Sequence, residues 1–416
     1  MRALRLGMFR SISSFIAVLG SAALLSVNAC TTEEELGREI PTDGGVTDDA
    51  SGPSLPDADV DVVDVDGSDP DVDAAPRTCS SQGFCHVPLP EPVTLRGVWG
   101  DGTGVVWAVA QEGKILRWDG STWTVHASVE GALFTIWGSG PTDLWIGGEL
   151  GIFHGVGPTS TQIAFTAVPS DSDIAITSIH GFGPNDVWAV GGRQWWDPET
   201  WEGHEESRVL HYTGPTGDPA TEWRRDPMSD RVAVFSSVWG SGPDDVWLGG
   251  RTDLDEPYGG VVLHGKRNGD ETTFTPVEIG TGFFDRIGRP TGGAALPDEV
   301  FVVGEDRNGL GYVWIGPRDP DAGGGTGPKI TNGDDFGTGY PITSVWGTSK
   351  NDAWIAGKGG RVWHWDGKDW AVGGVSLTKF PLMNDLHAMW GSPNGEMWIV
   401  GDQIAMRKNL AVGGDK

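Results

Sequence analysis

The chain has 416 residues, three cysteines and a formal charge of −29 at pH 7. A balance this acidic argues against binding to nucleic acid and against docking on anionic lipid, because both need clusters of Lys and Arg. We therefore expect no nucleic-acid partner, and any attachment to a membrane has to be covalent.

Residues 1–29 have the composition of an export signal. Three arginines precede an uncharged run over residues 12–27, which is short and rich in small residues for a membrane span. The segment ends in Val27-Asn28-Ala29-Cys30, which resembles the lipobox of bacterial lipoproteins. The resemblance implies that Cys30 is lipidated. Thr31, where retention in the inner membrane would favour Asp, implies an outer-membrane lipoprotein that faces the periplasm or the surface. An ordinary signal peptide with a cysteine near its cleavage site is the alternative.

Residues 30–76 form an acidic linker. Fifteen acidic residues accompany one basic residue and no aromatic residue, so the segment cannot bury enough apolar surface to offset the entropy lost on ordering. We expect a disordered tether. Its run 57–67 superficially resembles a calcium loop, but alignment on Gly67 places Val62 at the first ligand position and Asp73 where a bidentate Glu is needed; specific calcium binding is the alternative. The linker supplies −14 and the signal +3, which leaves −18 on residues 77–416.

An aromatic pair separated by eight positions recurs through residues 77–416. In the clearest copy, Leu133–Gly148, an apolar run ending in Trp137 meets a Ser-Gly-Pro turn and a second apolar run with Trp145. The seven copies are Trp99/Trp107, Trp137/Trp145, His180/Trp188, Trp239/Trp247, Gly293/Phe301, Trp346/Trp354 and Trp390/Trp398. The fifth is the weakest, because it lacks the first Trp and the glycine after it. Copies stand 38 to 59 residues apart, and a period near 40 to 45 that begins with a hairpin is typical of a propeller blade.

A second apolar hairpin follows each pair, so one unit supplies four strands. Its turn in the first unit is Asp-Gly-x-x-Trp, with Asp119 and Trp123, and the sixth unit repeats it with Asp366 and Trp370. This turn resembles the Asp-box of sialidases and related propellers, shortened by one residue. The resemblance implies a role in folding only. We predict an all-β chain in which residues 77–416 form a seven-bladed β-propeller of four-stranded blades.

The seventh unit lacks its fourth strand, because the chain ends soon after a strand at 404–407. Phe84 precedes Trp99 by 15 residues, much as Trp123 precedes Trp137 by 14. Residues 84–87 are therefore expected to complete the last blade, since an unpaired edge would invite aggregation. Cys79 and Cys85, the pair left in an exported chain after Cys30, are expected to form a disulfide; a metal site with ligands from elsewhere is the alternative.

Most of the 21 tryptophans are expected to pack between neighbouring blades, because their spacing follows the repeat. These structural residues are Trp99, Trp107, Trp137, Trp145, Trp188, Trp239, Trp247, Trp346, Trp354, Trp390 and Trp398.

Function is expected where the repeat is interrupted. Long insertions fall at Gly192–Ser207, Arg251–Gly259, Gly280–Gly292 and Ile315–Lys329, and the topology of a propeller places the first three on one face. The first holds the candidate ligand-binding residues Trp195, Trp196, Asp197, Glu199, Trp201 and His204. Indoles beside carboxylates can stack on a sugar ring or bind a cationic or peptide ligand. A loop packed on itself is the alternative.

The sequence offers little for catalysis. It has no nucleophile elbow, Walker loop or paired-His motif, and none of its four tyrosines has an obvious Glu partner, as a sialidase-like site would need. We expect no cofactor, no metal and no catalytic residues.

The repeats, signal, acidic tether and paired cysteines together resemble the Trp-Gly…Asp-Val-Trp-Ala-Val-Gly repeat lipoproteins of Gram-negative bacteria such as myxobacteria. Members are known mostly by their repeats, so the resemblance implies architecture rather than activity. We expect a monomeric, non-catalytic binding or scaffold module for glycan or protein ligands at the cell envelope. A carbohydrate-active propeller enzyme and a structural spacer without ligand are the alternatives.

Overall fold

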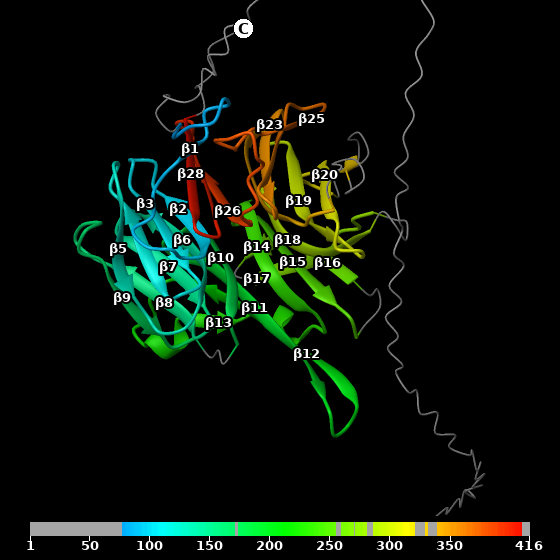
Figure 1. Cartoon of the computed structure of the whole chain (residues 1–416). Coiled ribbons are helices and arrows are strands. Elements are labelled where there is room, and N and C mark those ends of the chain that lie inside the picture. Colours follow the sequence, from blue (N-terminus) through cyan, green and yellow to red (C-terminus); the bar gives the residue numbers. More distant parts are fainter. Residues whose placement is uncertain are drawn as a thin grey trace, which may run out of the picture. The chain divides into compact units, whose positions relative to one another are not determined.

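The computed structural model describes residues 77–170, 174–254, 259–269, 271–280, 286–320, 329–331 and 339–409. They form seven four-stranded antiparallel sheets arranged as the blades of a ring (Figure 1). This confirms the predicted seven-bladed β-propeller. The predicted signal peptide, the predicted lipidation site Cys30 and the predicted linker over residues 30–76 lie outside the described residues. In the described part of the chain, no helix has the length and apolarity needed to cross a membrane.

Blades 1 to 6 each use four consecutive strands, ordered from the axis outward. Blades 1 and 2 are β2 (Leu95–Gly100), β3 (Val106–Ala110), β4 (Lys114–Trp118), β5 (Trp123–Ser128), and β6 (Leu133–Gly140), β7 (Asp143–Gly148), β8 (Gly151–Val156), β9 (Ala164–Val168). Blades 3 and 4 are β10 (Ile176–Gly183), β11 (Asp186–Asp197), β12 (Glu202–Tyr212), β13 (Trp223–Arg225), and β14 (Val234–Gly242), β15 (Asp245–Thr252), β16 (Gly259–Asn268), β17 (Glu271–Pro276). Blades 5 and 6 are β18 (Ile287–Ala295), β19 (Glu299–Asp306), β20 (Gly311–Pro317), β21 (Lys329–Thr331), and β22 (Ile342–Ser349), β23 (Asp352–Gly357), β24 (Arg361–Trp365), β25 (Trp370–Val372). Two short 3-10 helices, η1 (Pro219–Thr221) and η2 (Pro227–Asp230), flank β13.

Blade 7 is closed by the N-terminal strand, as predicted. It contains β26 (Leu386–Gly391), β27 (Glu396–Gly401) and β28 (Ile404–Asn409), and β1 (Cys85–His86) pairs with the outer edge of β28. Val87 extends the pairing by donating its N–H to the carbonyl of Ala405 at 2.9 Å. The predicted Cys79–Cys85 disulfide is present and precedes this strand. The ring is therefore joined through hydrogen bonds between its two chain ends.

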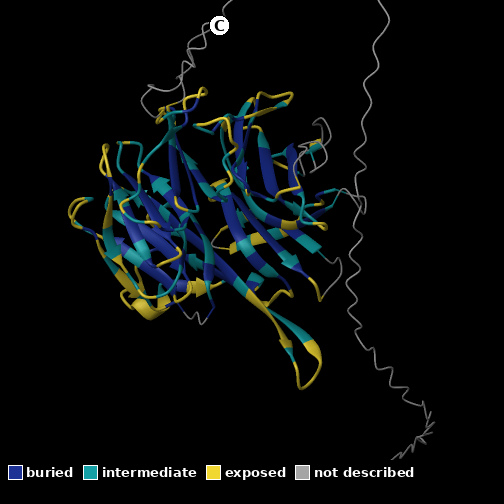
Figure 2. Cartoon of the chain, viewed as in Figure 1, coloured by how far each residue is buried: buried dark blue, intermediate teal, exposed yellow. Residues whose placement is uncertain are grey.

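The hydrophobic core is divided among the seven contacts between blades (Figure 2). In each contact, the aromatic residue of the second strand of one blade packs among the strands of the next. Trp107, Trp145, Trp188, Trp247 and Trp398 in these positions are fully buried, at 0 to 1 % exposure. Because a buried indole removes about 150–250 Å² of surface from water, these side chains dominate the contacts between blades.

The Trp-Gly dipeptide of the repeat has a direct packing reason. The indole of Trp99 in blade 1 occupies the space where Gly138 of blade 2 would carry a Cβ, and Trp346 of blade 6 does the same at Gly391 of blade 7. The glycine of one blade thus receives the first Trp of the blade before it. Any side chain at this glycine would displace an indole.

The fifth repeat pairs one residue away from the predicted position. Phe301 lies opposite Ala294, and Gly293 lies opposite Val302. The indole of Trp239 in blade 4 packs against Gly293. The glycine after the first aromatic position is lost in this copy, as expected, because Ala295 follows Ala294. The incoming indole is received instead by Gly293, one residue before that position.

The Asp-Gly-x-x-Trp turns lie between the third and fourth strands. Asp119 Oδ1 accepts hydrogen bonds from the backbone N–H groups of Ser121 and Thr122, both at 2.8 Å. These bonds, with the hydroxyl of Ser121, lower the pKa of Asp119 to about 2. The Asp366 side chain accepts equivalent bonds from Lys368 and Asp369. Both aspartates therefore fix an outer turn.

Candidate functional site

The first insertion is a continuous extension of two strands, not a loop. Strands β11 and β12 stay paired without a break from Val187 opposite Tyr212 to Asp197 opposite Glu202. Only residues 198–201 form the connecting turn. Figure 1 shows this hairpin projecting from the ring, and Figure 2 shows its end exposed. The repeat pattern located the insertion but missed its strand structure.

The three predicted indoles are exposed on this hairpin. Trp195, Trp196 and Trp201 are 43 %, 58 % and 76 % exposed. Trp195 stacks on His204 across the strand pair, with ring centroids 5.1 Å apart, and Trp196 meets Trp201 edge to face at 6.5 Å. Successive residues of a strand point to opposite faces, so Trp195 and His204 cover one face of the hairpin and Trp196 and Trp201 cover the other, and each pair leaves indole surface exposed. This projecting end of the hairpin is called the tip.

The turn at the tip is held by Asp197. Its Oδ1 accepts the backbone N–H of Glu199 at 2.8 Å, and its carbonyl accepts the N–H of Trp201 at 2.9 Å. The bond from Glu199, with hydrogen bonds from Thr200, lowers the pKa of the Asp197 carboxyl. Trp201 has a φ of 58°, in the left-handed region that bulky residues seldom adopt. The turn therefore presents a large indole outward from a strained backbone.

The base of the hairpin is tied to blade 4. Glu205 accepts the Thr252 hydroxyl at 3.0 Å and the Asp253 backbone N–H at 2.7 Å. The neighbouring Leu254 side chain lies beside Gly203 and is 43 % exposed. The described parts of the first two insertions thus meet on one face of the ring, here called the hairpin face. The segments 255–258 and 281–285 of the second and third insertions lie outside the described residues.

Charge is distributed unevenly along the hairpin. Near the base, Arg193 and Arg208 both pair with Glu206, at 2.7 and 3.1 Å. Glu199 and Glu202 stand near the tip, and no ion pair involves them among the described residues. The tip therefore combines exposed indoles with two free carboxylates.

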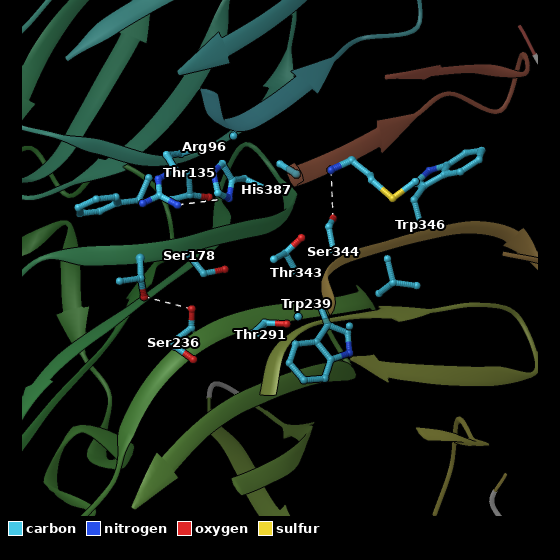
Figure 3. A pocket seen from close by; sticks show the side chains of 18 of the residues that line it. Arg96, Thr135, Ser178, Ser236, Trp239, Thr291, Thr343, Ser344, Trp346 and His387 are labelled. Carbon is cyan, nitrogen blue, oxygen red and sulfur yellow. Dashed lines mark hydrogen bonds between the residues drawn. The ribbon is translucent and has the colours of Figure 1, made fainter. Parts of the chain in front are cut away.

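A second feature is a cavity of about 1040 Å³ on the axis, lined by the innermost strand of every blade (Figure 3). One position of each inner strand is a β-bulge residue that lies three places before the first aromatic position of the repeat. We call these residues the bulge ring: Arg96, Phe134, Thr177, Ser236, Thr291, Thr343 and His387. A bulge re-aims its side chain, and here it contributes the side chain to the cavity wall.

Four members of the bulge ring join neighbouring blades through hydroxyl groups. Each donates to a carbonyl of the next inner strand: Thr177 to Ser236 at 3.1 Å, Ser236 to Pro290 at 3.2 Å, Thr291 to Ile342 at 2.7 Å and Thr343 to Leu386 at 2.6 Å. The last contact of the ring, between blades 7 and 1, departs from this pattern. There Arg96 Nη1 lies 3.3 Å from His387 Nδ1.

The Arg96–His387 pair is held from both sides. Arg96 Nε donates to Gln111 Oε1 at 3.1 Å, and His387 Nε2 lies 2.7 Å from Asp402 Oδ1. Because a guanidinium only donates, His387 Nδ1 accepts and its Nε2–H donates to Asp402. Desolvation lowers the pKa of His387 although the Asp402 carboxylate opposes it. The sequence analysis did not identify these residues. The offset of three positions before each first aromatic residue would have identified them.

Four histidines lie on the face of the ring opposite the hairpin face, and they were not predicted from the sequence. Each stacks on the second Trp of its blade and bonds the aspartate at the start of that strand. The four pairs are His154–Asp143, His211–Asp186, His264–Asp245 and His364–Asp352. They are structural, because each joins two strands of one blade beneath the surface turn. Within the described residues, no group of three or more His, Cys, Asp or Glu side chains is placed to hold a metal ion.

Comparisons with known proteins agree with the fold. No protein-family model and no curated protein matches the chain. Among solved structures, it is similar to YCF48 from Cyanidioschyzon merolae, with 13 % identity, a TM-score of 0.56, and coverage of 79 % of this chain and 99 % of that one. A structure of YCF48 bound to D1 peptide gives 13 % identity and a TM-score of 0.55, covering 81 % and 98 %.

Two other kinds of propeller are also similar. The WD40 repeats of RRP9 align with 10 % identity and a TM-score of 0.55, covering 80 % of this chain and 99 % of that one. Virginiamycin B lyase from Staphylococcus aureus aligns with 11 % identity and a TM-score of 0.51, covering 79 % and 99 %. At these identities the likeness concerns the fold alone, so function has to be argued from the site.

Proposed function

We propose that this chain is an exported, lipid-anchored, non-catalytic binding module. We further propose that its β11–β12 hairpin binds a basic, apolar segment of a protein partner. The observation that carries the proposal is the exposure of Trp196 and Trp201 at the end of a paired hairpin. A lone solvent-facing indole is common, but three on one projection mark an interaction surface. Trp and Tyr are the residues that most often dominate protein interfaces.

The charge of the tip supports a cationic partner. Glu199 and Glu202 stand beside the indoles, and residues 77–416 carry −18. A Lys or Arg of the partner can pair with a carboxylate and lie over an indole face at the same time. Long-range attraction from the acidic ring would also raise the association rate at low salt.

The geometry favours a protein over a glycan and over a substrate. The indoles lie at the projecting tip, and none of them lines the axial cavity. Enzymes and most small-ligand sites enclose their ligands in a concave pocket. One of the similar structures is YCF48 bound to D1 peptide. It supplies a precedent for a peptide-binding protein of this fold but does not identify the partner.

Binding is tested with defined probes. An array of basic, leucine-containing peptides and their Glu-substituted counterparts is probed with the wild type and with a Trp195→Ser, Trp196→Ser, Trp201→Ser triple variant. We expect the basic peptides to bind, binding to weaken with salt, and the triple variant to lose it while its melting temperature stays unchanged. A glycan array runs in parallel. Binding to glycans alone would contradict the protein-docking proposal, and turnover of a bound glycan would support the enzymatic alternative.

Anchoring is tested separately. Cys30→Ala should leave the protein unlipidated and soluble. Cys79 and Cys85 remain in this variant, but both are in the disulfide and are not available for lipidation. A Cys30→Ala protein that still fractionates with outer membranes would contradict attachment through this residue.

A further inference from the structure

The axial cavity holds a polar arrangement that the hairpin proposal does not use. Six of the seven bulge-ring residues are polar, and the seventh is Phe134. Four of the polar ones are Ser or Thr that bond the next blade. Only the contact between blades 7 and 1 replaces hydroxyls with Arg96 and His387 (Figure 3). The hydroxyl pattern is therefore absent at the contacts that would use Arg96, Phe134 and His387, and the closing contact between blades 7 and 1 is where two of these side chains, Arg96 and His387, meet.

Arg96 is held in a fixed orientation. Its Nε is bound by Gln111 and its Nη1 by His387, while Asp402 fixes the imidazole. The Nη2 group has no hydrogen-bond partner among the described residues. A guanidinium that is held at Nε and Nη1 and keeps both N–H groups of Nη2 free is a preformed site for a carboxylate, because little rotamer entropy is left to lose on binding.

The other charges of the cavity limit the ligand to a small negative charge. Arg289 and Lys358 also line the wall, and so do Glu305, Asp385 and Asp402. Asp402 accepts from His387, Asp385 accepts the Gly359 N–H at 2.9 Å, and Glu305 pairs with Arg289 at 3.9 Å. Three cationic and three anionic side chains give no excess of positive charge. A polyanion such as a phosphorylated ligand is therefore disfavoured, and a single carboxylate fits.

The rest of the wall favours a hydroxylated ligand. The Ser and Thr oxygens of the bulge ring keep lone pairs that can accept from ligand hydroxyls. At about 1040 Å³, the cavity lies at the upper end of the roughly 300–1,000 Å³ that ligand pockets span, so a monosaccharide fits together with water. A purely apolar acid would leave these hydroxyl groups facing apolar surface.

We propose that the axial cavity binds a sugar acid, with the carboxylate on the free Nη2 group of Arg96 and the hydroxyl groups toward the Ser and Thr of the bulge ring. Gln111, His387 and Asp402 act as positioning residues for Arg96. This site is independent of the hairpin, so either proposal can fail without the other.

The test uses the mature chain and four small probes in calorimetric titrations: glucuronate, its neutral methyl ester, glucose and acetate. Glucuronate should bind saturably with one site per chain. The methyl ester and glucose should bind at least about tenfold more weakly, because they lose the charge-assisted hydrogen bonds. Acetate should also bind at least about tenfold more weakly, because it has no hydroxyl groups.

The residue assignment is tested with Arg96→Gln and a matched control, Arg224→Gln. Arg224 is exposed on β13, on the outer edge of blade 3. Arg96→Gln should weaken glucuronate at least about tenfold, and Arg224→Gln should leave its affinity unchanged. A thermal melt of each variant establishes that it folds. If Arg96→Gln does not fold, the comparison of glucuronate with its methyl ester on the wild type decides the charge assignment.

The proposal is overturned by any of four results. These are no saturable binding of glucuronate, equal binding of the ester or of glucose, equal binding of acetate, and a folded Arg96→Gln variant with wild-type affinity. A Trp195, Trp196, Trp201 triple variant should bind glucuronate normally, which separates this site from the hairpin.

Discussion

Arg318 of blade 5 donates from its Nε to Asp245 Oδ2 of blade 4 at 2.8 Å, so one ion pair joins two blades. The same carboxylate also accepts from His264 at 2.9 Å, from Trp247 at 2.8 Å and from Ser241 at 2.5 Å. Burial raises the pKa of Asp245, but these four donors outweigh it and hold the pKa well below its usual range. Asp186 and Arg267 repeat the arrangement between blades 3 and 4, at 2.7 Å.

Asp245→Asn should destabilise the ring. The amide cannot accept from all four donors and leaves at least one of them unpaired in a buried place, at a cost of about 1–3 kcal/mol. Arg318→Met should cost less, about 1 kcal/mol or below, because the guanidinium is 37 % exposed and screened by water. Urea unfolding curves measure both. Equal losses in the two variants would contradict the view that the carboxylate is the centre of this network.

The free energy of unfolding should fall in two stages as the pH is lowered. Desolvation lowers the pKa of His180 to about 4 although the Gly240 carbonyl opposes it. The unfolded imidazole titrates near 6.5, so the unfolded state takes up this proton first and stability falls as the pH drops from about 6.5 to 4. Asp245 affects stability below that pH range. The contribution of its ionised carboxylate to the free energy of unfolding is present above about pH 4 and is lost as the pH falls further.

Variants separate the two stages. His180→Gln should lessen the decline between about pH 6.5 and 4, to which His387 also contributes because its pKa is lowered too. Asp245→Asn should lessen the decline below it, to which Asp186 and Asp352 also contribute. Free energies of unfolding measured over this pH range provide the readout. An unchanged upper stage in His180→Gln would contradict the assignment to this ring.

Gly391→Ala should destabilise the contact between blades 6 and 7. A Cβ at Gly391 would overlap the nearest atoms of the Trp346 indole, so the indole or the backbone would have to shift. Overpacking of this kind costs about 1–3 kcal/mol. Gly140→Ala is the matched control, because a Cβ there meets no atom within 4 Å. A Gly391→Ala protein as stable as the control would show that the dipeptide repeats for another reason.

Phe84→Ala should loosen the closure of the ring. Phe84 is fully buried and meets Trp354 of blade 6 edge to face at 5.7 Å, so it joins the N-terminal segment to blade 6 beside the strand that completes blade 7. Truncation should cost about 3–5 kcal/mol and lower the cooperativity of the melt. Phe380→Ala, at an 80 % exposed position, should have little effect. Identical melts for the two variants would argue that closure rests on the backbone pairing of β1 alone.

The fold could be predicted from the sequence because the repeated positions are occupied by large aromatic residues. Trp pairs at a fixed separation fixed the blade number, and the position of Phe84 gave the closing strand. The fifth copy was misplaced by one residue, because it lacks the second bulge that blades 2, 3, 4 and 6 carry before the turn, so its paired positions Ala294 and Phe301 are seven residues apart and not eight. A fixed spacing in the sequence does not indicate whether a bulge is present, so the shift of one residue in the fifth copy was not predicted.

The sites were predicted less completely, for physical reasons. The indoles of the hairpin stood out because they leave the repeat, but two long paired strands were not distinguishable from a loop in a run rich in acidic residues and interrupted by Pro198. Arg96 and His387 were missed because they lie 291 residues apart in the chain and meet only when the ring closes. Pairing of the first and last blades is a property of the whole fold and not of any local pattern.

The central claim, that the projecting hairpin is the docking element, is tested most directly by shortening it. Gln194 lies directly opposite Glu205, so residues 195–204 can be replaced by Asn-Gly, which closes a two-residue hairpin in register. The affinity for a basic, leucine-containing peptide is then measured for both proteins. We predict loss of binding with an unchanged melting temperature and unchanged binding of glucuronate. Retained peptide affinity in the shortened protein would contradict the account.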